Sequence, residues 1–140
     1  MWVSLHTHSQ YSILDSTASI SGLVSCAKGY GMPALALTDF GNMYGAIDFY
    51  KACISEGIKP IIGCEIMLAP DALAVKKKTP GTPVGTPIVL LAKNEQGYHN
   101  LCKLTSIAHV EGFYYFPRID KEVLSQHAGG LICLSGPLSS

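Results

Sequence analysis

The segment Gly31-Met-Pro-Ala-Leu-Ala-Leu-Thr-Asp39 indicates the fold, because a second segment, Gly57-Ile-Lys-Pro-Ile-Ile-Gly-Cys-Glu65, repeats its plan. Each segment has a glycine that can end a helix, then a proline, an apolar run typical of a buried strand, and a carboxylate at the end of that strand. His6 and His8 follow the first predicted strand in the same way. In a barrel of alternating strands and helices the carboxyl ends of the strands form one face, so we expect these side chains to share a cleft.

Strand patterns alternate with helix patterns along the chain. Apolar runs predict strands at residues 2–6, 34–38, 60–66, 88–92 and 131–134. Stripes of apolar residues at helical spacing predict helices marked by Ile20, Leu23, Val24 and Ala27, by Met43, Ile47, Tyr50 and Ile54, and by Leu101, Leu104, Thr105 and Ala108, with a short helix around 120–127. This alternation predicts an α/β fold with about five parallel strands, as an open sheet or a barrel, and the repeated strand-end carboxylates favour the barrel.

The length and composition limit what the chain can be. A complete eight-unit barrel needs about 250 residues, so 140 residues predict a single truncated domain, the N-terminal part of a longer barrel. Lys plus Arg and Asp plus Glu both number 10, which excludes a general polyanion-binding face. The five cysteines form no Cys-x-x-Cys pair, and no secretory signal or membrane span is visible, so we expect a cytoplasmic protein without a membrane partner.

His6-Thr-His8 is the strongest chemical signal in the sequence. Two histidines at i and i+2 on extended backbone face the same side and can hold one metal ion. With Asp15, Asp39 and Glu65 in the proposed cleft, they would suit a metal-assisted phosphoester hydrolase. The same spacing also fits strand-end histidines that only form hydrogen bonds with their neighbours, and the residues alone leave the two interpretations even.

Basic residues offer a second, weaker signal. Arg118 is the only arginine and could bind a phosphate or a partner's carboxylate, or form a surface salt bridge. Lys76, Lys77 and Lys78 fall in the loop predicted between residues 70 and 87, where a run of lysines is usually only solvated.

Several motifs together resemble a known family. They are His6-Thr-His8-Ser-Gln-Tyr-Ser-Ile-Leu-Asp15, the two segments quoted first, Gly41-Asn-Met-Tyr-Gly-Ala46 and Pro117-Arg-Ile-Asp120. Over nearly the whole chain, the sequence resembles the N-terminal PHP (polymerase and histidinol phosphatase) domains of bacterial DNA polymerase III alpha subunits. The resemblance implies a distorted, TIM-like (β/α)7 barrel, of which this chain would be the first half or more.

The resemblance also implies a metal site that has lost ligands. Carried over by position, its metal-binding candidates are His6, His8, Asp15 and Glu65, with Asp39 a weaker one. Three positions where the family has ligands hold Phe40, Pro87 and Pro137, which cannot ligate a metal. The resemblance therefore implies a degenerate site for zinc or manganese.

Two functions of different classes follow from the resemblance. The first is a structural and docking module of a replicative DNA polymerase. The second is an active metal-dependent phosphoesterase, either a 3′–5′ exonuclease or a small-molecule phosphatase. The parent protein would be a Mg²⁺-dependent nucleotidyltransferase whose catalytic carboxylates lie outside this chain. Its partners would be DNA, a proofreading exonuclease, a sliding clamp and a clamp loader.

Overall fold

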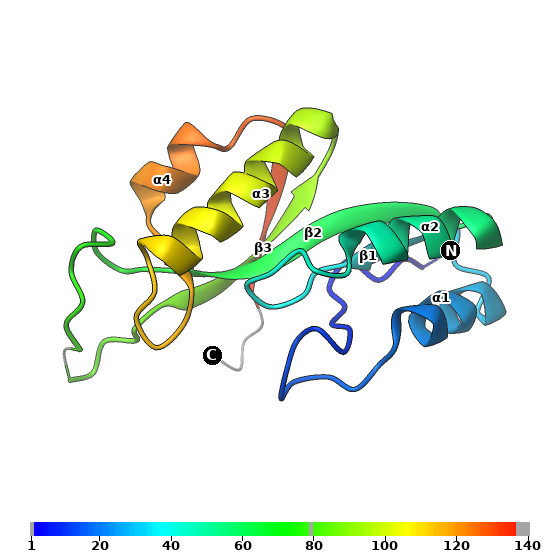
Figure 1. Ribbon diagram of the computed structural model, residues 1–140, viewed down its shortest axis with the longest axis horizontal. Coiled ribbons are helices and arrows are strands. Elements are labelled where there is room, and N and C mark those ends of the chain that lie inside the picture. The colour runs from blue at the N-terminus through cyan, green and yellow to red at the C-terminus, as the bar shows by residue number, and fades with distance from the viewer. Residues whose placement is uncertain (1, 79, 137–140) are drawn as a thin grey trace.

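The computed structural model describes residues 2–78 and 80–136 (Figure 1). In chain order the elements are α1 (Ile20–Gly29), β1 (Ala34–Leu37), α2 (Ala46–Glu56), β2 (Lys59–Leu68), β3 (Thr86–Ala92), α3 (Glu95–Val110), β4 (Arg118–Ile119), α4 (Lys121–Gln126) and β5 (Leu131–Ser135). The predicted α/β class and the predicted number of about five strands are confirmed, although one of the strands lies at a different place in the chain. Within the described residues, no helix is long and apolar enough to cross a bilayer.

The strand β2 organises the sheet, whose order is β1-β2-β3-β5, with β4 also paired to β2. The first half of β2 pairs in parallel with β1, where Leu37 lies opposite Ile62. The second half pairs in parallel with β4 and, along its other edge, antiparallel with β3. The strand β5 adds to β3, again antiparallel. A single ten-residue strand therefore joins the N-terminal and C-terminal halves of the chain.

The prediction of a wholly parallel sheet is wrong, because β3 runs antiparallel to both of its neighbours. Among the described residues between β2 and β3, 69–78 and 80–85, there is no helix, only a loop. A parallel neighbour needs a crossover connection that carries the chain back along the sheet, whereas a loop that stays at one end lets the strand reverse. The Pro, Gly and Lys composition of this segment indicates a loop but does not by itself specify the direction of the strand that follows.

The predicted strand at residues 2–6 is also wrong: this segment is extended but forms no regular ladder. The segment runs alongside β1. The backbone carbonyls of Ser4 and Thr7 accept hydrogen bonds from Ala36 N (3.0 Å) and Thr38 N (2.9 Å). The Thr7 N–H donates to the Thr38 hydroxyl at 2.8 Å instead of to a backbone carbonyl. A side chain thus replaces the ladder partner that a strand would need. The sheet gains its remaining strand from β4, a two-residue strand that the sequence pattern did not predict.

Among the described residues three apolar clusters form the core, a small one of Ala36, Val89 and Leu91 and two larger ones at opposite ends of β2. Helices α1 and α2 pack with β1 through Ile20, Val24, Ala27, Leu35, Leu37, Phe49, Cys53 and Ile58. Helix α3 packs on β2, β3 and β4 through Cys64, Ile66, Leu90, Leu101, Leu104, Ala108 and Ile119, and α4 adds to this cluster at its margin. Figure 1 shows the two helix pairs at opposite ends of the sheet.

Side-chain caps define where three of the helices begin. Ser19 accepts a hydrogen bond from Gly22 N at the start of α1, and Asn94 accepts one from Gly97 N at the start of α3. Asp120 caps α4 by accepting from Val123 N at 2.8 Å. These bonds satisfy N–H groups that have no partner within their own helix.

The buried face of α2 differs from the predicted stripe. Ile47, Tyr50 and Ile54 are more than half exposed, at 56%, 52% and 56%. The buried residues are Ala46, Phe49 and Cys53. Both faces have helical spacing, and the one with two small residues lets the helix approach the sheet closely while Phe49 fills the core. Periodicity alone could not choose between the two faces.

We predict that Phe49→Ala lowers the free energy of unfolding by about 3–5 kcal/mol, because the ring is fully buried and its loss leaves a cavity. Ile47→Ala, on the exposed face of the same helix, is the matched control and should change it by no more than about 0.5 kcal/mol. Urea unfolding followed by circular dichroism measures both. Equal losses in the two variants would contradict this assignment of the buried face.

Candidate metal centre

The N-terminal segment is held at the end of β1 by a buried carboxylate, that of Asp39, which is 2% exposed. One of its oxygens, Oδ1, accepts hydrogen bonds from Ser9 N (2.6 Å) and Ser12 Oγ (2.7 Å). The other, Oδ2, accepts one from Ser9 Oγ at 2.7 Å. Ser12 Oγ in turn accepts from Phe40 N at 3.0 Å. This network fixes the turn that follows His8 against the strand.

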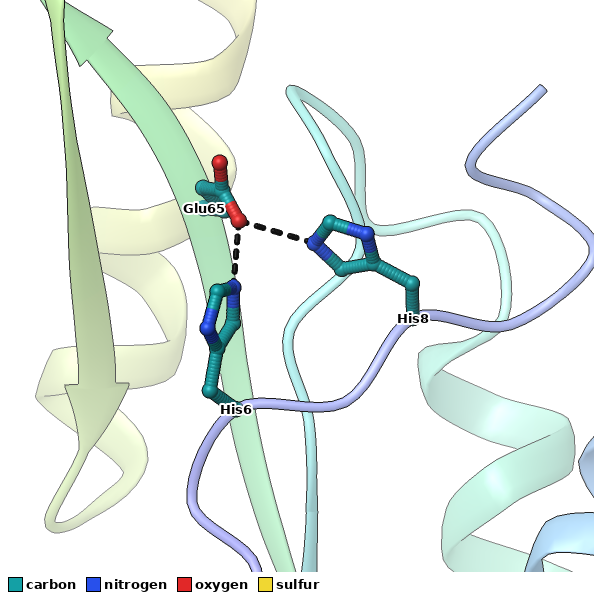
Figure 2. A group of neighbouring side chains, drawn as sticks. All are labelled: His6, His8 and Glu65. Atoms are coloured by element: carbon teal, nitrogen blue, oxygen red, sulfur yellow. Dashed lines mark hydrogen bonds and ion pairs between the residues drawn. The ribbon is translucent and has the colours of Figure 1, made fainter. Parts of the chain in front are cut away.

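Three of the predicted metal-binding residues come together beside this turn. Nε2 of His6 and Nε2 of His8 both contact Glu65 Oε2, the latter at 2.8 Å (Figure 2). The three ligand atoms all lie within 4.8 Å of one another. The two imidazole rings meet edge to face, with centroids 5.1 Å apart. The histidines come from the N-terminal segment and Glu65 from β2, so the cluster joins residues far apart in the sequence.

Burial and hydrogen bonding oppose each other at this cluster. Burial acts to raise the pKa of Glu65, but the hydrogen bonds from His8 and His6 outweigh it and leave this pKa below its ordinary value. The hydrogen bond to Glu65 raises the pKa of His8 against the opposing effect of burial, and the negative charges of Asp39 and Asp15 add to the increase. In the metal-free protein, His8 and Glu65 therefore favour a charged pair.

The other two predicted carboxylate ligands, Asp39 and Asp15, lie outside the cluster formed by His6, His8 and Glu65. Both oxygens of Asp39 are occupied by the serine hydrogen bonds, so this side chain positions the histidine segment. Asp15 is exposed in the turn after Ser12, and it acts on the cluster only through its charge. In this structure neither Asp39 nor Asp15 belongs to the group formed by His6, His8 and Glu65.

Phe40 lies directly beside the cluster. It pairs with Glu65 in an isolated parallel bridge, in which Gly41 N donates to Glu65 O at 2.7 Å. Paired residues of neighbouring strands point to the same face of a sheet, so the ring of Phe40 and the carboxylate of Glu65 lie on the same face. The ring is half-buried and meets Phe116 edge to face at 6.0 Å. A hydrocarbon side chain thus stands next to the candidate ligands.

The remaining positions at which the family resemblance implies lost ligands are two prolines. Pro87 is buried in β3 opposite Met67, one same-face pair along from Glu65 and Val89. Pro137 lies outside the described residues. Pro87 therefore occupies the face of the sheet that carries Glu65 and has no atom to offer a metal ion.

Two functional side chains escaped the sequence interpretation. Ser9 and Ser12 both belong to the motif quoted from His6 to Asp15, but nothing in their spacing indicates that they would bind the carboxylate of Asp39 at the end of β1.

Cys64, next to Glu65, is fully buried, and burial raises the pKa of its thiol to about 12. Its side chain lies in the apolar cluster beneath α3, on the opposite face of β2 from Glu65, so this cysteine is a core residue that points away from the cluster of His6, His8 and Glu65.

Arg118 does not form the surface salt bridge that was one of the possibilities for it. It is only 3% exposed, and among the described residues it forms no ion pair. Its Nε donates to the Gly112 carbonyl at 3.0 Å and its Nη1 donates to the Val84 carbonyl at 3.1 Å.

The residues present suit one divalent ion. Two imidazole nitrogens and one carboxylate oxygen are the donor set of several catalytic zinc sites, which keep a further position open. The convergence of His6, His8 and Glu65 on one point supplies these three donors. The structure thus provides a candidate metal-binding group, without specifying the metal.

Several proteins with similar sequences carry the same name, DNA polymerase III subunit alpha. The chain is 59% identical over 139 residues to the DNA polymerase III subunit alpha of Chlamydia pneumoniae, covering 99% of this chain and 11% of that protein. It is 51% identical over 138 residues to that of Treponema pallidum, with 99% and 12% covered. With the Thermus aquaticus protein it shares 46% identity over 139 residues, with 97% and 11% covered. The chain therefore spans little more than a tenth of the length of these relatives.

Solved structures support the fold, and a family model supports the assignment. A protein from Bifidobacterium adolescentis named as a metal-dependent phosphoesterase matches with a TM-score of 0.52 and 20% identity, over 76% of this chain and 34% of that one. An amidohydrolase from Chromobacterium violaceum matches with a TM-score of 0.51 and 19% identity, over 75% and 34%. At such identities the likeness shows the fold alone. The PHP domain model matches residues 4–140, nearly the whole chain. This chain belongs to the PHP domain family.

Proposed function

We propose that this chain is the PHP module of a replicative DNA polymerase III alpha subunit, and that its role is structural and docking. The identity to several alpha subunits over nearly the whole chain supports the proposal. Nucleotidyl transfer, with its Mg²⁺, would belong to parts of the polymerase outside this chain. Contacts with DNA, the proofreading exonuclease, the sliding clamp and the clamp loader would be made through the parent protein. Residues 1–140 would form the N-terminal part of the PHP barrel.

The observation that carries the structural role is the position of Phe40. Its backbone pairs with Glu65, and its ring shares the face that carries the ligand cluster. Pro87 lies on the same face. Two-metal phosphoryl transfer needs two ions about 3.5–4 Å apart, and therefore more protein donors than a single ion does. Among the described residues, His6, His8 and Glu65 form the one candidate group, which is enough for one ion.

We assign a holding role to the residual cluster. His6, His8 and Glu65 would bind one zinc or manganese ion, while Asp39 would keep the histidine segment in place through Ser9 and Ser12. When bound, such an ion polarises a phosphoryl oxygen as a Lewis acid. Phe40 would exclude water from one side of the cluster. An ion held in this way would link the N-terminal segment to β2 and stabilise the module.

An active phosphoesterase is the second candidate. The convergence of two histidines and a glutamate on one point favours it, because this donor set also occurs in hydrolytic zinc enzymes. Metal stoichiometry and the effect of restoring a histidine at position 40 distinguish the two candidates.

We predict about one tightly bound zinc ion per protein molecule after dialysis against zinc, because the cluster offers three ligands. His8→Ala and Glu65→Gln should each weaken zinc binding by at least about tenfold, since each removes a ligand. His99→Ala is the matched control, because His99 is exposed on α3, outside the cluster. Elemental analysis and calorimetry on protein purified without chelator measure both quantities. Two or more tightly bound ions, lost in His8→Ala, would favour the phosphoesterase.

We predict that Phe40→His alone does not create phosphoesterase activity, because Pro87 and Pro137 still offer no ligands. The assay is release of p-nitrophenol from a p-nitrophenyl phosphodiester with zinc or manganese present. Phe116→His, which adds an imidazole to the neighbouring ring position, is the matched control. Hydrolysis by Phe40→His but not by Phe116→His would show that a single residue had disabled an otherwise complete site.

In the metal-free protein we expect the stabilising effect of Glu65 to depend on pH. The pKa of His8 is raised above its ordinary value of 6.5, so its contribution is complete below pH 6.5 and is lost as the pH rises through the raised value. The pKa of Glu65 is lowered below 4.5, so its contribution is complete above pH 4.5 and is lost as the pH falls through the lowered value. The pair should therefore stabilise the protein most between pH 4.5 and 6.5.

The measurement is the difference in unfolding free energy between the unaltered protein and Glu65→Gln, from urea unfolding with a chelator present. Within the stated pH window we expect a difference on the order of 1 kcal/mol, since His8 is partly exposed and its charge is screened. A difference that stays constant from about pH 4 to 8 would show that the charges of the pair contribute nothing.

A further inference from the structure

One residue, Thr38, holds the backbone of Thr7, which stands between the two candidate ligand histidines. The Thr7 N–H donates to the Thr38 hydroxyl oxygen at 2.8 Å. The Thr7 carbonyl accepts from Thr38 N at 2.9 Å and from the Thr38 hydroxyl at 3.2 Å. Both backbone polar groups of Thr7 are therefore bonded to Thr38.

These bonds act on the two peptide groups that adjoin the histidines. The N–H of Thr7 belongs to the peptide group shared with His6, and its carbonyl belongs to the one shared with His8. A rotation of either peptide group would turn the adjoining histidine. Both histidines point toward Glu65 (Figure 2), so the orientation that Thr38 fixes is the one in which they converge.

The side chain of Thr38 lies on the face of the sheet that carries Glu65. Thr38 is fully buried and lies two residues before Phe40, whose backbone pairs with Glu65. Residues two apart on a strand share a face. The Thr38 methyl group packs against Gly63, where an added Cβ would come within 2.9 Å of Cγ2. With the methyl group against β2, the hydroxyl on the same Cβ faces the N-terminal segment.

The hydroxyl of Thr38 serves the histidine segment alone. Among the described residues its hydrogen bonds go only to Thr7, one accepted and one donated. A buried hydroxyl is costly unless it is hydrogen-bonded, and this one is satisfied entirely by a segment without a regular ladder. Removing the hydroxyl would leave the Thr7 N–H without its partner.

We propose that Thr38 is a positioning residue of the candidate metal centre, whose hydroxyl makes His6 and His8 converge on Glu65 before an ion binds. The proposal rests on the holding role given above to these three residues. Ligands that are ordered in advance bind an ion more tightly, because less conformational freedom is lost on binding. Thr38 acts between the histidines, whereas Asp39 fixes the turn after them.

The first test compares two substitutions of Thr38. Thr38→Val removes the hydroxyl and keeps the shape, whereas Thr38→Ser keeps the hydroxyl. Thr38→Val should weaken zinc binding by about tenfold or more, the range seen for residues that orient metal ligands, and Thr38→Ser should retain most of the affinity. Competition with a chromophoric chelator measures zinc affinity, on protein that circular dichroism shows to be folded.

Thr105→Val is the matched control. Thr105 is also a buried threonine, and its hydroxyl donates to the Leu101 carbonyl within α3, outside the metal centre. The substitution removes the same group from the core, so it reports the effect of losing a buried hydroxyl as such. It should leave zinc affinity unchanged.

A second test needs no metal. With a chelator present, the NMR signals of the imidazole Cε1–H groups report the surroundings of each histidine. Thr38→Val should shift the signals of His6 and His8 and leave that of the exposed His99 in place. Thr38→Ser and Thr105→Val should leave all three in place. A general loss of structure would move other histidine signals as well, so a shift confined to His6 and His8 identifies positioning.

The outcomes separate this proposal from the holding role of the cluster. Zinc binding by folded Thr38→Val as tight as that of the unaltered protein would overturn the positioning role while leaving the holding role intact. If Thr38→Val does not fold, Thr38→Ser decides: retained affinity supports the role of the hydroxyl, and lost affinity overturns it. If the unaltered protein binds no zinc, the holding role fails. The NMR signals then decide the positioning role, which unshifted His6 and His8 signals in Thr38→Val would overturn.

Discussion

The buried carboxylate of Asp39 holds the N-terminal segment in place, and the candidate metal centre depends on it. This segment has no regular ladder, so its position rests on a few hydrogen bonds to the end of β1. Three donors from Ser9 and Ser12 satisfy the carboxylate, which would otherwise be an unpaired charge in the interior. With the turn fixed, His6 and His8 can face Glu65. A residue that looked like a ligand in the sequence therefore acts through hydrogen bonds.

The strand β2 connects this positioning to the core. Successive side chains of a strand alternate between its faces, so Cys64 and Ile66 enter the apolar cluster beneath α3 while Glu65 faces the histidines. The packing of α3 thus fixes where the glutamate lies. The same strand pairs with Phe40 on the face that carries Glu65. The geometry that builds the cluster also places a hydrocarbon ring beside it, and both follow from the register of one strand.

Charge is segregated in this chain despite its zero net charge. Acidic side chains lie around the candidate metal centre: Glu65 is buried in it, and the negative charges of Asp39 and Asp15 act on His8. The hollow beneath the loop between β2 and β3 gathers Lys77, Lys78 and Arg118. Composition averages over both regions, so it excludes a broad basic face but not a local one. A net charge of zero is thus compatible with one local group of acidic side chains and one local group of basic side chains.

The sequence by itself determined the α/β class, most helices and the convergence of His6, His8 and Glu65, because these follow from local periodicity and from residues placed at strand ends. Only the tertiary structure decided the antiparallel direction of β3, the inward face of α2 and the burial of Arg118. Each of these depends on which distant segment supplies the partner: a loop in place of a crossover, a sheet that accepts Phe49, and the Gly112 and Val84 carbonyls that accept from the guanidinium. Local patterns specify periodicity, whereas burial is decided by packing between elements.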